Sequence, residues 1–174
     1  MATRRHVWTK AGVNKNSYIS YQKPMSRYTQ IVYQLVFATK YRLPTLQKSV
    51  RPRIFAYMST VLLNKKCHSY IVNGVEDHVH LIFSLHPTVA LSDLVRDVKL
   101  SARDLIKEND LLPEWGGWQK GYGAFTYDQT AVPNLVNYVK RQEEHHADQT
   151  FEVEFKRLLD RHDVSYDEAW LFEE

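Results

Sequence analysis

Apolar and polar residues alternate along residues 28–39, the first stretch of the chain with a regular pattern. Every second position there is apolar: Ile31, Tyr33, Leu35 and Phe37. Because successive side chains of a strand point to opposite faces, this period of two predicts a β-strand with one apolar face. Residues 1–27 are polar and basic with weak periodicity, and no regular element is predicted there.

The rest of the chain alternates between helical and strand-like spacing. Apolar residues three and four apart indicate helices, and short runs rich in β-branched and aromatic residues indicate strands. The expected order is a helix over 47–64, strands over 67–73 and 77–85 joined by a hairpin at Gly74, a helix over 91–108, a strand over 118–127, a helix from Pro133 to about His146, and a helix over about 150–161.

This order, β-α-β-β-α-β followed by helices, is the ferredoxin-like split βαβ pattern. We therefore expect an α+β fold, with an antiparallel sheet, helices on one face and an added C-terminal helix that carries Tyr138. The expected organisation is a basic N-terminal extension, residues 1–27, followed by a single domain over residues 28–174.

Composition narrows the class of protein. The chain has 174 residues, of which 44% are hydrophobic and 25% charged, as in ordinary globular proteins. Its one cysteine, Cys67, excludes an internal disulfide and a multi-cysteine zinc site. No apolar run approaches the roughly 18 residues of a membrane helix. The simplest expectation is a cytoplasmic protein.

The net charge of +3 conceals a strong asymmetry. Residues 1–66 carry 13 Lys and Arg and no acid, whereas residues 67–174 carry 10 basic and 20 acidic residues, so that +13 and −10 sum to +3. A basic, tyrosine-rich segment of this kind indicates a polyanion such as nucleic acid, although a merely solubilising surface has the same composition.

The sharpest local motif is His78-Val79-His80 in the expected strand 77–85. Side chains two apart on a strand point the same way, so the two imidazoles would stand together as a pair of metal ligands. Glu76 or Asp77 could orient one imidazole. Alone, the motif is more typical of two surface histidines at the start of a strand.

Tyr138 and Gln142 form a second pair, four residues apart on the helix expected after Pro133. A tyrosine hydroxyl near a divalent cation is a potential nucleophile, and an amide oxygen is a potential ligand. By itself the pair is common, and Tyr138 could simply be a packing residue. Tyr122 and Tyr127, which are rival nucleophiles, lie in an expected strand without such an amide partner.

Other candidates have simpler explanations. Glu143, Glu144, His145 and His146 resemble a metal cluster, but helical spacing spreads them around the axis, which favours a solvated helix end. Four basic residues could contact DNA phosphates or could be ordinary surface charges: Lys40, Arg42, Lys99 and Arg103.

Taken together, these motifs resemble those of the single-tyrosine, His-hydrophobe-His transposases of the IS200-like family. The resemblance covers roughly residues 28–172. It rests on five segments in matching order and spacing: 33–42, 74–81, 91–99 leading into Ser101, 118–126 and 137–146.

The resemblance implies a DNA transposase. His78 and His80 would bind Mg²⁺ or Mn²⁺, Gln142 would be the third ligand, and Tyr138 would attack a DNA phosphodiester to form a 5′-phosphotyrosine. The implied substrates are single-stranded DNA and hairpins at element ends. The implied assembly is a homodimer whose active sites are shared between subunits.

Two other functions remain open from the residues alone. A non-catalytic, domesticated nucleic-acid-binding protein on a ferredoxin-like sheet would use the basic segment without the tyrosine chemistry. A metal-binding structural protein with no DNA role would have no salt-dependent affinity for DNA, and the charge asymmetry disfavours it.

Overall fold

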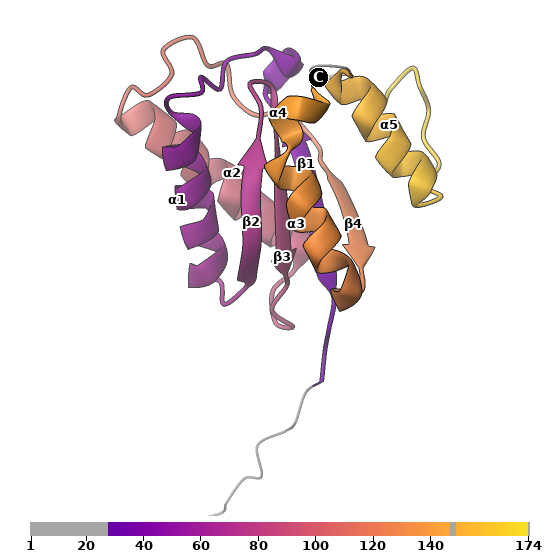
Figure 1. Ribbon diagram of the computed structural model, residues 1–174. Coiled ribbons are helices and arrows are strands. Elements are labelled where there is room, and N and C mark those ends of the chain that lie inside the picture. Colours follow the sequence, from indigo (N-terminus) through magenta and orange to yellow (C-terminus); the bar gives the residue numbers. More distant parts are fainter. Residues whose placement is uncertain (1–27, 147–148, 174) are drawn as a thin grey trace, which may run out of the picture.

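A four-stranded antiparallel sheet with strand order β2-β3-β1-β4 forms the centre of the structure, a computed structural model (Figure 1). The structure describes residues 28–146 and 149–173, so the expected extension over residues 1–27 lies outside the described residues. The strands are β1 (Val32–Ala38), β2 (His68–Gly74), β3 (His78–Ser84) and β4 (Gly123–Tyr127). The expected α+β class is confirmed.

Helices cover both faces of this sheet. On one face α1 (Arg51–Asn64) packs against α2 (Leu91–Glu108). On the other face α3 (Val132–Lys140) crosses β2 and β3, and α5 (Phe151–Arg161) contacts β4 (Figure 1). Because β1 is central and covered on both sides, neighbouring residues such as Val36 and Phe37 are both fully buried. None of the described helices is long and apolar enough to cross a membrane.

The short connection between β2 and β3 sets the position of the first histidine. A Cβ atom on Gly74 would lie 2.2 Å from the carbonyl oxygen of His78, so only glycine fits at this end of the hairpin. The Val75 amide then donates to that same carbonyl at 3.1 Å. The hairpin holds the start of β3 close against the end of β2.

Two expected elements differ from those observed. The last strand begins at Gly123 rather than at 118, because Gly121 adopts a positive φ angle that interrupts extended structure. Trp118 keeps only an isolated bridge to Thr39. The helix expected from Pro133 to His146 is broken at Arg141, which has φ −97° and ψ 20°. The short α4 (Gln142–His145) follows the break.

Candidate active site

Both histidines of the His78-Val79-His80 motif lie on the sheet face that α3 and α5 cover. Val79 points to the opposite side and joins the core beneath α1 and α2, as the strand parity predicts. Both imidazoles are fully buried, with ring centroids 5.0 Å apart. A pair of surface histidines is therefore excluded.

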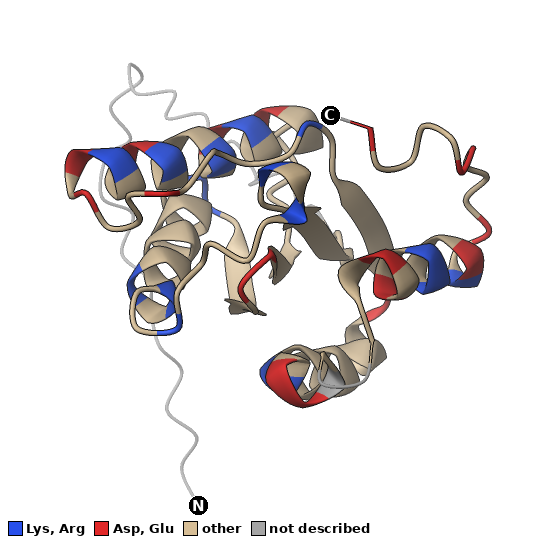
Figure 2. Ribbon diagram, turned by 90° about the horizontal axis from the view of Figure 1, so that it is seen from above, with Lys and Arg blue, Asp and Glu red and all other residues tan. Residues whose placement is uncertain are grey.

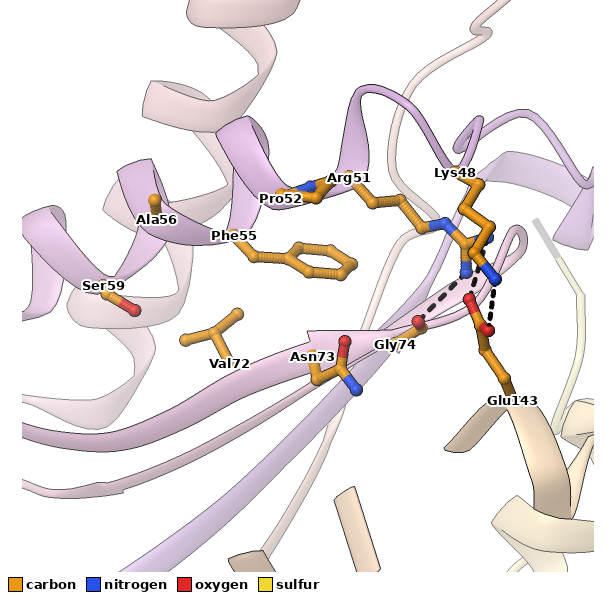
Figure 3. Close-up of a pocket in the computed structure, with 10 residues that line it drawn as sticks. All are labelled: Lys48, Arg51, Pro52, Phe55, Ala56, Ser59, Val72, Asn73, Gly74 and Glu143. Atoms are coloured by element: carbon orange, nitrogen blue, oxygen red, sulfur yellow. Dashed lines mark hydrogen bonds and ion pairs between the residues drawn. The ribbon is translucent and has the colours of Figure 1, made fainter. Parts of the chain in front are cut away.

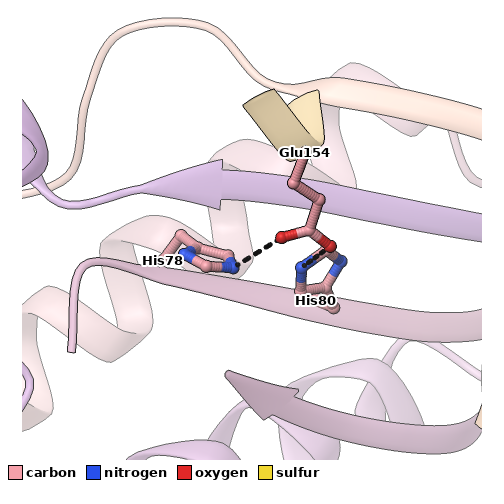
Figure 4. A group of neighbouring side chains, drawn as sticks. All are labelled: His78, His80 and Glu154. Carbon is pink, nitrogen blue, oxygen red and sulfur yellow. Dashed lines mark ion pairs between the residues drawn. The ribbon is translucent and has the colours of Figure 1, made fainter. Parts of the chain in front are cut away.

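Glu154 on α5 lies between the two imidazoles (Figure 4). Its Oε2 atom is 3.4 Å from His78 Nε2, and its Oε1 atom is 3.2 Å from His80 Nε2. The carboxylate is 1% exposed, and potential ligand atoms of the three residues lie within 4.8 Å of one another. Glu154 is thus the residue on which the two histidines converge.

The sequence reasoning missed Glu154, although the chain contained a signal for it. The final helix is amphipathic, and its apolar stripe includes Phe151, Phe155 and Leu158, all buried. Glu154 falls inside that stripe, three residues after Phe151 and four before Leu158. A carboxylate at a core position is rarely buried without partners, so its place on the stripe indicates a polar site.

Tyr138 and Gln142 reach the same carboxylate from α3 and α4. The Tyr138 hydroxyl donates a hydrogen bond to Glu154 Oε1. Gln142, fully buried, donates from Nε2 to Glu154 Oε1 at 3.0 Å, and its Oε1 lies 3.4 Å from His78 Nε2. Although the helix is broken at Arg141, Tyr138 and Gln142 both contact Glu154. They therefore lie at one site with the histidines of the same chain.

Contacts with α1 and β2 hold the segment that carries Gln142 (Figure 3). Lys48 and Arg51 reach Glu143 at 2.6 and 3.5 Å, and Arg51 also donates to the Gly74 carbonyl at 3.2 Å. Asn73 donates to the Val139 carbonyl at 2.8 Å, next to Tyr138. A cavity of about 430 Å³ is lined by Lys48, Arg51, Asn73, Gly74 and Glu143, among others. The contacts fix α3 and α4 relative to the histidine strand.

The environment sets opposite protonation states for the two histidines. Burial disfavours charge on His78, but hydrogen bonds and charges from Asp77 and Glu154 outweigh it and raise the pKa of His78 to about 9. Its Nδ1 is 2.6 Å from Asp77 Oδ1, so Asp77 orients this ring. Burial lowers the pKa of His80, and the charge of Glu154 only partly offsets it.

The carboxylate and the phenol are shifted as well. Burial alone would raise the pKa of the Glu154 carboxyl, but the imidazoles of His80, His146 and His78 hold that pKa well below its usual range. Burial, together with the negative charge of Glu154, raises the pKa of the Tyr138 hydroxyl. The site as it stands pairs an ionised carboxylate with a protonated tyrosine.

A series of hydrogen-bonded polar side chains begins at the Nδ1 atom of His80. Gln34 Nε2 is 3.3 Å from His80 Nδ1, the Tyr127 hydroxyl donates to Gln34 Oε1 at 2.8 Å, and His162 Nε2 is 2.9 Å from that hydroxyl. On the other side, His80 Nε2 has no hydrogen-bond partner within the described part of the chain. That buried nitrogen lies 3.2 Å from the Glu154 carboxylate, within ion-pair distance, but forms no hydrogen bond with it.

The other residues singled out in the sequence are scattered. His146, expected on a solvated helix end, instead contacts Glu154 Oε2 at 2.8 Å, so that expectation is wrong for His146. Glu144 pairs with Arg141 at the surface, as expected. The side chain of His145 is outside what the structure describes.

Of the four candidate DNA-contacting cations, none reaches the histidines. Lys99 and Arg103 lie on α2, on the opposite face of the sheet, where Lys99 donates to the Gln119 carbonyl and Arg103 pairs with Asp104. Lys40 lies over the ring of Tyr41. Arg42 pairs with Glu152 of α5 at 2.8 Å, at the rim of a cavity that Asp77 and His146 also line.

The donor atoms that meet here fit a divalent metal ion. Two imidazole nitrogens and a carboxylate are a ligand set that leaves coordination positions open in metalloenzymes. His80 Nε2 is a second sign, because this buried nitrogen lies 3.2 Å from Glu154 Oε1 but forms no hydrogen bond with any described residue, and a buried polar atom without a hydrogen bond is costly. His78, His80 and Glu154 could therefore hold a cation, with Gln142 Oε1 close by.

Comparisons with known proteins agree on one family. Residues 27–142, well over half of the chain, match the family described as transposase, IS200-like. The ISDra2 transposase TnpA of Deinococcus radiodurans is 27% identical over 118 residues, which are 65% of this chain and 84% of that protein.

Two solved structures share the fold. A crystal structure from Deinococcus radiodurans R1, described as a transposase, has a TM-score of 0.54 and 22% identity, covering 70% of this chain and 97% of that one. A REP-associated tyrosine transposase bound to a REP hairpin has a TM-score of 0.52 and 16% identity, covering 82% and 93%.

Proposed function

Because the chain belongs to the IS200-like transposase family, we propose that it cuts and rejoins single-stranded DNA through a covalent link to Tyr138. One observation carries this proposal. Tyr138, His78, His80 and Gln142 come from three separate elements and converge on one buried carboxylate, Glu154. A tyrosine that only packs against the sheet does not need two histidines and a carboxylate around its hydroxyl.

The metal ion that the family resemblance implies, Mg²⁺ or Mn²⁺, would be held by Nε2 of His78, Nε2 of His80 and the carboxylate of Glu154. Gln142 Oε1 is the further ligand that the resemblance implies. When bound, such a cation supplies positive charge that favours the tyrosinate and polarises the scissile phosphate. Asp77 holds the proton on Nδ1 of His78, so Nε2 is the nitrogen that would give up its proton to a bound cation.

In the proposed reaction, the Tyr138 oxygen attacks phosphorus in a DNA phosphodiester. The new bond joins that oxygen to the 5′ phosphate, and the bond from phosphorus to the 3′ oxygen breaks. Glu154 Oε1 orients the Tyr138 hydroxyl through the existing hydrogen bond, the hydroxyl proton passes to water as the new bond forms, and the leaving 3′ oxygen takes a proton from water. Attack by a 3′ hydroxyl on the phosphotyrosine reverses the step and rejoins DNA.

The proposed substrate is single-stranded DNA with a hairpin at the end of a mobile element. The hairpin in a structure of similar fold and the basic composition of residues 1–66 support this choice. Residues 1–27 are proposed as a DNA-binding extension before the domain over residues 28–174. Lys40 and Arg42 are proposed as phosphate contacts, and Lys99 and Arg103 would serve only DNA that reaches the far face.

The direct test incubates the protein with Mn²⁺ and labelled single-stranded DNAs that carry varied hairpins, followed by a denaturing gel. The proposal predicts a labelled band that migrates with the protein and a shortened DNA product. Protein that binds these DNAs with salt-dependent affinity but never gives the covalent band would instead be a non-catalytic DNA-binding protein.

Glu154→Gln is expected to slow cleavage by about a hundredfold or more, since it removes both a charged ligand and the charged hydrogen-bond acceptor that orients the Tyr138 hydroxyl. Single-turnover cleavage rates and Mn²⁺ affinity measured by calorimetry provide the readouts. The matched control is Glu152→Gln, a partly exposed carboxylate on the same helix that pairs with Arg42 and does not contact the histidines. A rate for Glu154→Gln equal to or above that of the wild type would contradict the role assigned to this carboxylate.

A homodimer with shared active sites is implied by the resemblance, yet Tyr138 here approaches the histidines of its own chain. We therefore expect a mixture of Tyr138→Phe and His80→Ala proteins to stay inactive, because neither chain has a complete site. Cleavage by the mixture is compared with each variant alone at equal total protein. Restored cleavage on mixing would mean that the tyrosine acts on the partner's metal site.

A further inference from the structure

A second cavity opens directly beside Tyr138, between α3 and α5. It measures about 380 Å³, and both Tyr138 and Glu154 line it, so it is continuous with the candidate active site. Gln34 and Tyr127 also line it from the sheet. A volume near the lower end of small-molecule pockets, about 300–1,000 Å³, suits one nucleotide rather than a duplex stem.

The side of α5 that faces this cavity carries two positive charges. Four residues of α5 line the cavity: Glu154, Arg157, Leu158 and Arg161. Arg157 and Leu158 lie three and four residues after Glu154, and Arg161 lies four after Arg157, so all four share one side of the helix. Arg157 and Arg161 are separated by about 6 Å along the helix axis. This side of α5 therefore runs from Glu154, which contacts the histidines, to the guanidinium groups of Arg157 and Arg161 along the cavity.

These two arginines differ from the other arginines of the described residues. Every other one forms a hydrogen bond or ion pair with an acidic or amide side chain: Arg42, Arg51, Arg53, Arg96, Arg103 and Arg141. Within the same described part, no ion pair or hydrogen bond involves the side chains of Arg157 and Arg161, and both residues are exposed. Figure 2 shows that basic and acidic residues interleave along the helices.

We infer that the cavity between α3 and α5 binds the nucleotide next to the scissile phosphate of single-stranded DNA, an inference that rests on the proposed function. Arg157 and Arg161 hold phosphates of the strand, since paired guanidinium groups without acidic partners favour an anion. The base packs against apolar and aromatic lining such as Leu135 and Tyr127. The strand would then run from Tyr138 along α5.

Arg157→Gln, Arg161→Gln and the double variant test this in the full chain. Fluorescence anisotropy measures binding of labelled single-stranded DNA in EDTA over a range of salt concentrations. Each substitution is expected to weaken binding several-fold and to reduce the slope of log K against log salt by about 0.7. Arg53→Gln, on the far side of the sheet and bonded to Asn109, is the control and should leave the slope unchanged.

Equal slopes for the wild type and the double variant would overturn the inference, as would an equal loss in Arg53→Gln. A second probe is a hairpin with no single-stranded flank. Its affinity should be insensitive to Arg157 and Arg161, and an equal loss on this duplex would also overturn the inference. Covalent adduct formation by the wild type tests the proposed function separately, because the binding slopes are measured without metal and without cleavage.

Discussion

Tyr138→Phe is expected to abolish the covalent protein–DNA adduct and to lower cleavage by at least about a thousandfold, as loss of a nucleophile does in other enzymes. The ring stays in place between α3 and the sheet, and only the hydroxyl that donates to Glu154 is removed. DNA affinity in EDTA should therefore remain close to that of the wild type. Denaturing gels measure the adduct, and anisotropy measures binding.

Tyr122→Phe is the matched control for this experiment. Tyr122 precedes β4, is 38% exposed, and lines a different cavity from that of Tyr138. Its substitution should leave both the adduct and the cleavage rate unchanged. An adduct that persists in Tyr138→Phe and disappears in Tyr122→Phe would show that Tyr122, not Tyr138, is the nucleophile.

His80→Ala is expected to remove most Mn²⁺ binding and, with it, DNA cleavage. His80 Nε2 is a fully buried nitrogen without a hydrogen-bond partner among the described residues, and it faces Glu154. Loss of a direct ligand should weaken metal affinity by more than the roughly 10–100-fold that loss of an outer partner costs. Calorimetric titration with Mn²⁺ gives the affinity without any need for activity.

The control for this variant is His68→Ala, because His68 is exposed at the start of β2 and contacts the ring of Tyr70 rather than the site. The metal should also raise the melting temperature of the wild type and of His68→Ala, but not that of His80→Ala. Wild-type Mn²⁺ affinity in His80→Ala would show that the metal, if any, binds elsewhere.

Local periodicity predicted most elements of the fold. The apolar spacing of residues 91–108 matches α2 from Leu91 to Glu108, and the strand expected over 77–85 contains β3. The misses come from residues whose effect is conformational. Glycines at positive φ delay β4, and the turn at Arg141 separates α3 from α4 without any proline or glycine to signal it.

The candidate site was predictable only in part. Strand parity was enough to place His78 and His80 side by side, because that geometry depends on neighbours in sequence. Their contacts with Glu154 and His146 join β3 to residues about seventy positions later in the chain. A local sequence pattern does not predict contacts between residues so far apart. The buried carboxylate on the apolar stripe of α5 was the one local sign of it.

The most direct test of Tyr138 as the nucleophile is to map the residue that carries DNA after reaction. The wild-type protein is incubated with Mn²⁺ and a single-stranded hairpin DNA, then digested with trypsin and a nuclease. Cleavage after Lys120 and Lys140 gives one peptide, residues 121–140, that contains the tyrosines to be distinguished: Tyr122, Tyr127 and Tyr138. Fragment-ion masses should place the residual nucleotide on Tyr138. A nucleotide on Tyr122 or Tyr127, or an unmodified peptide from an active reaction, would contradict the account.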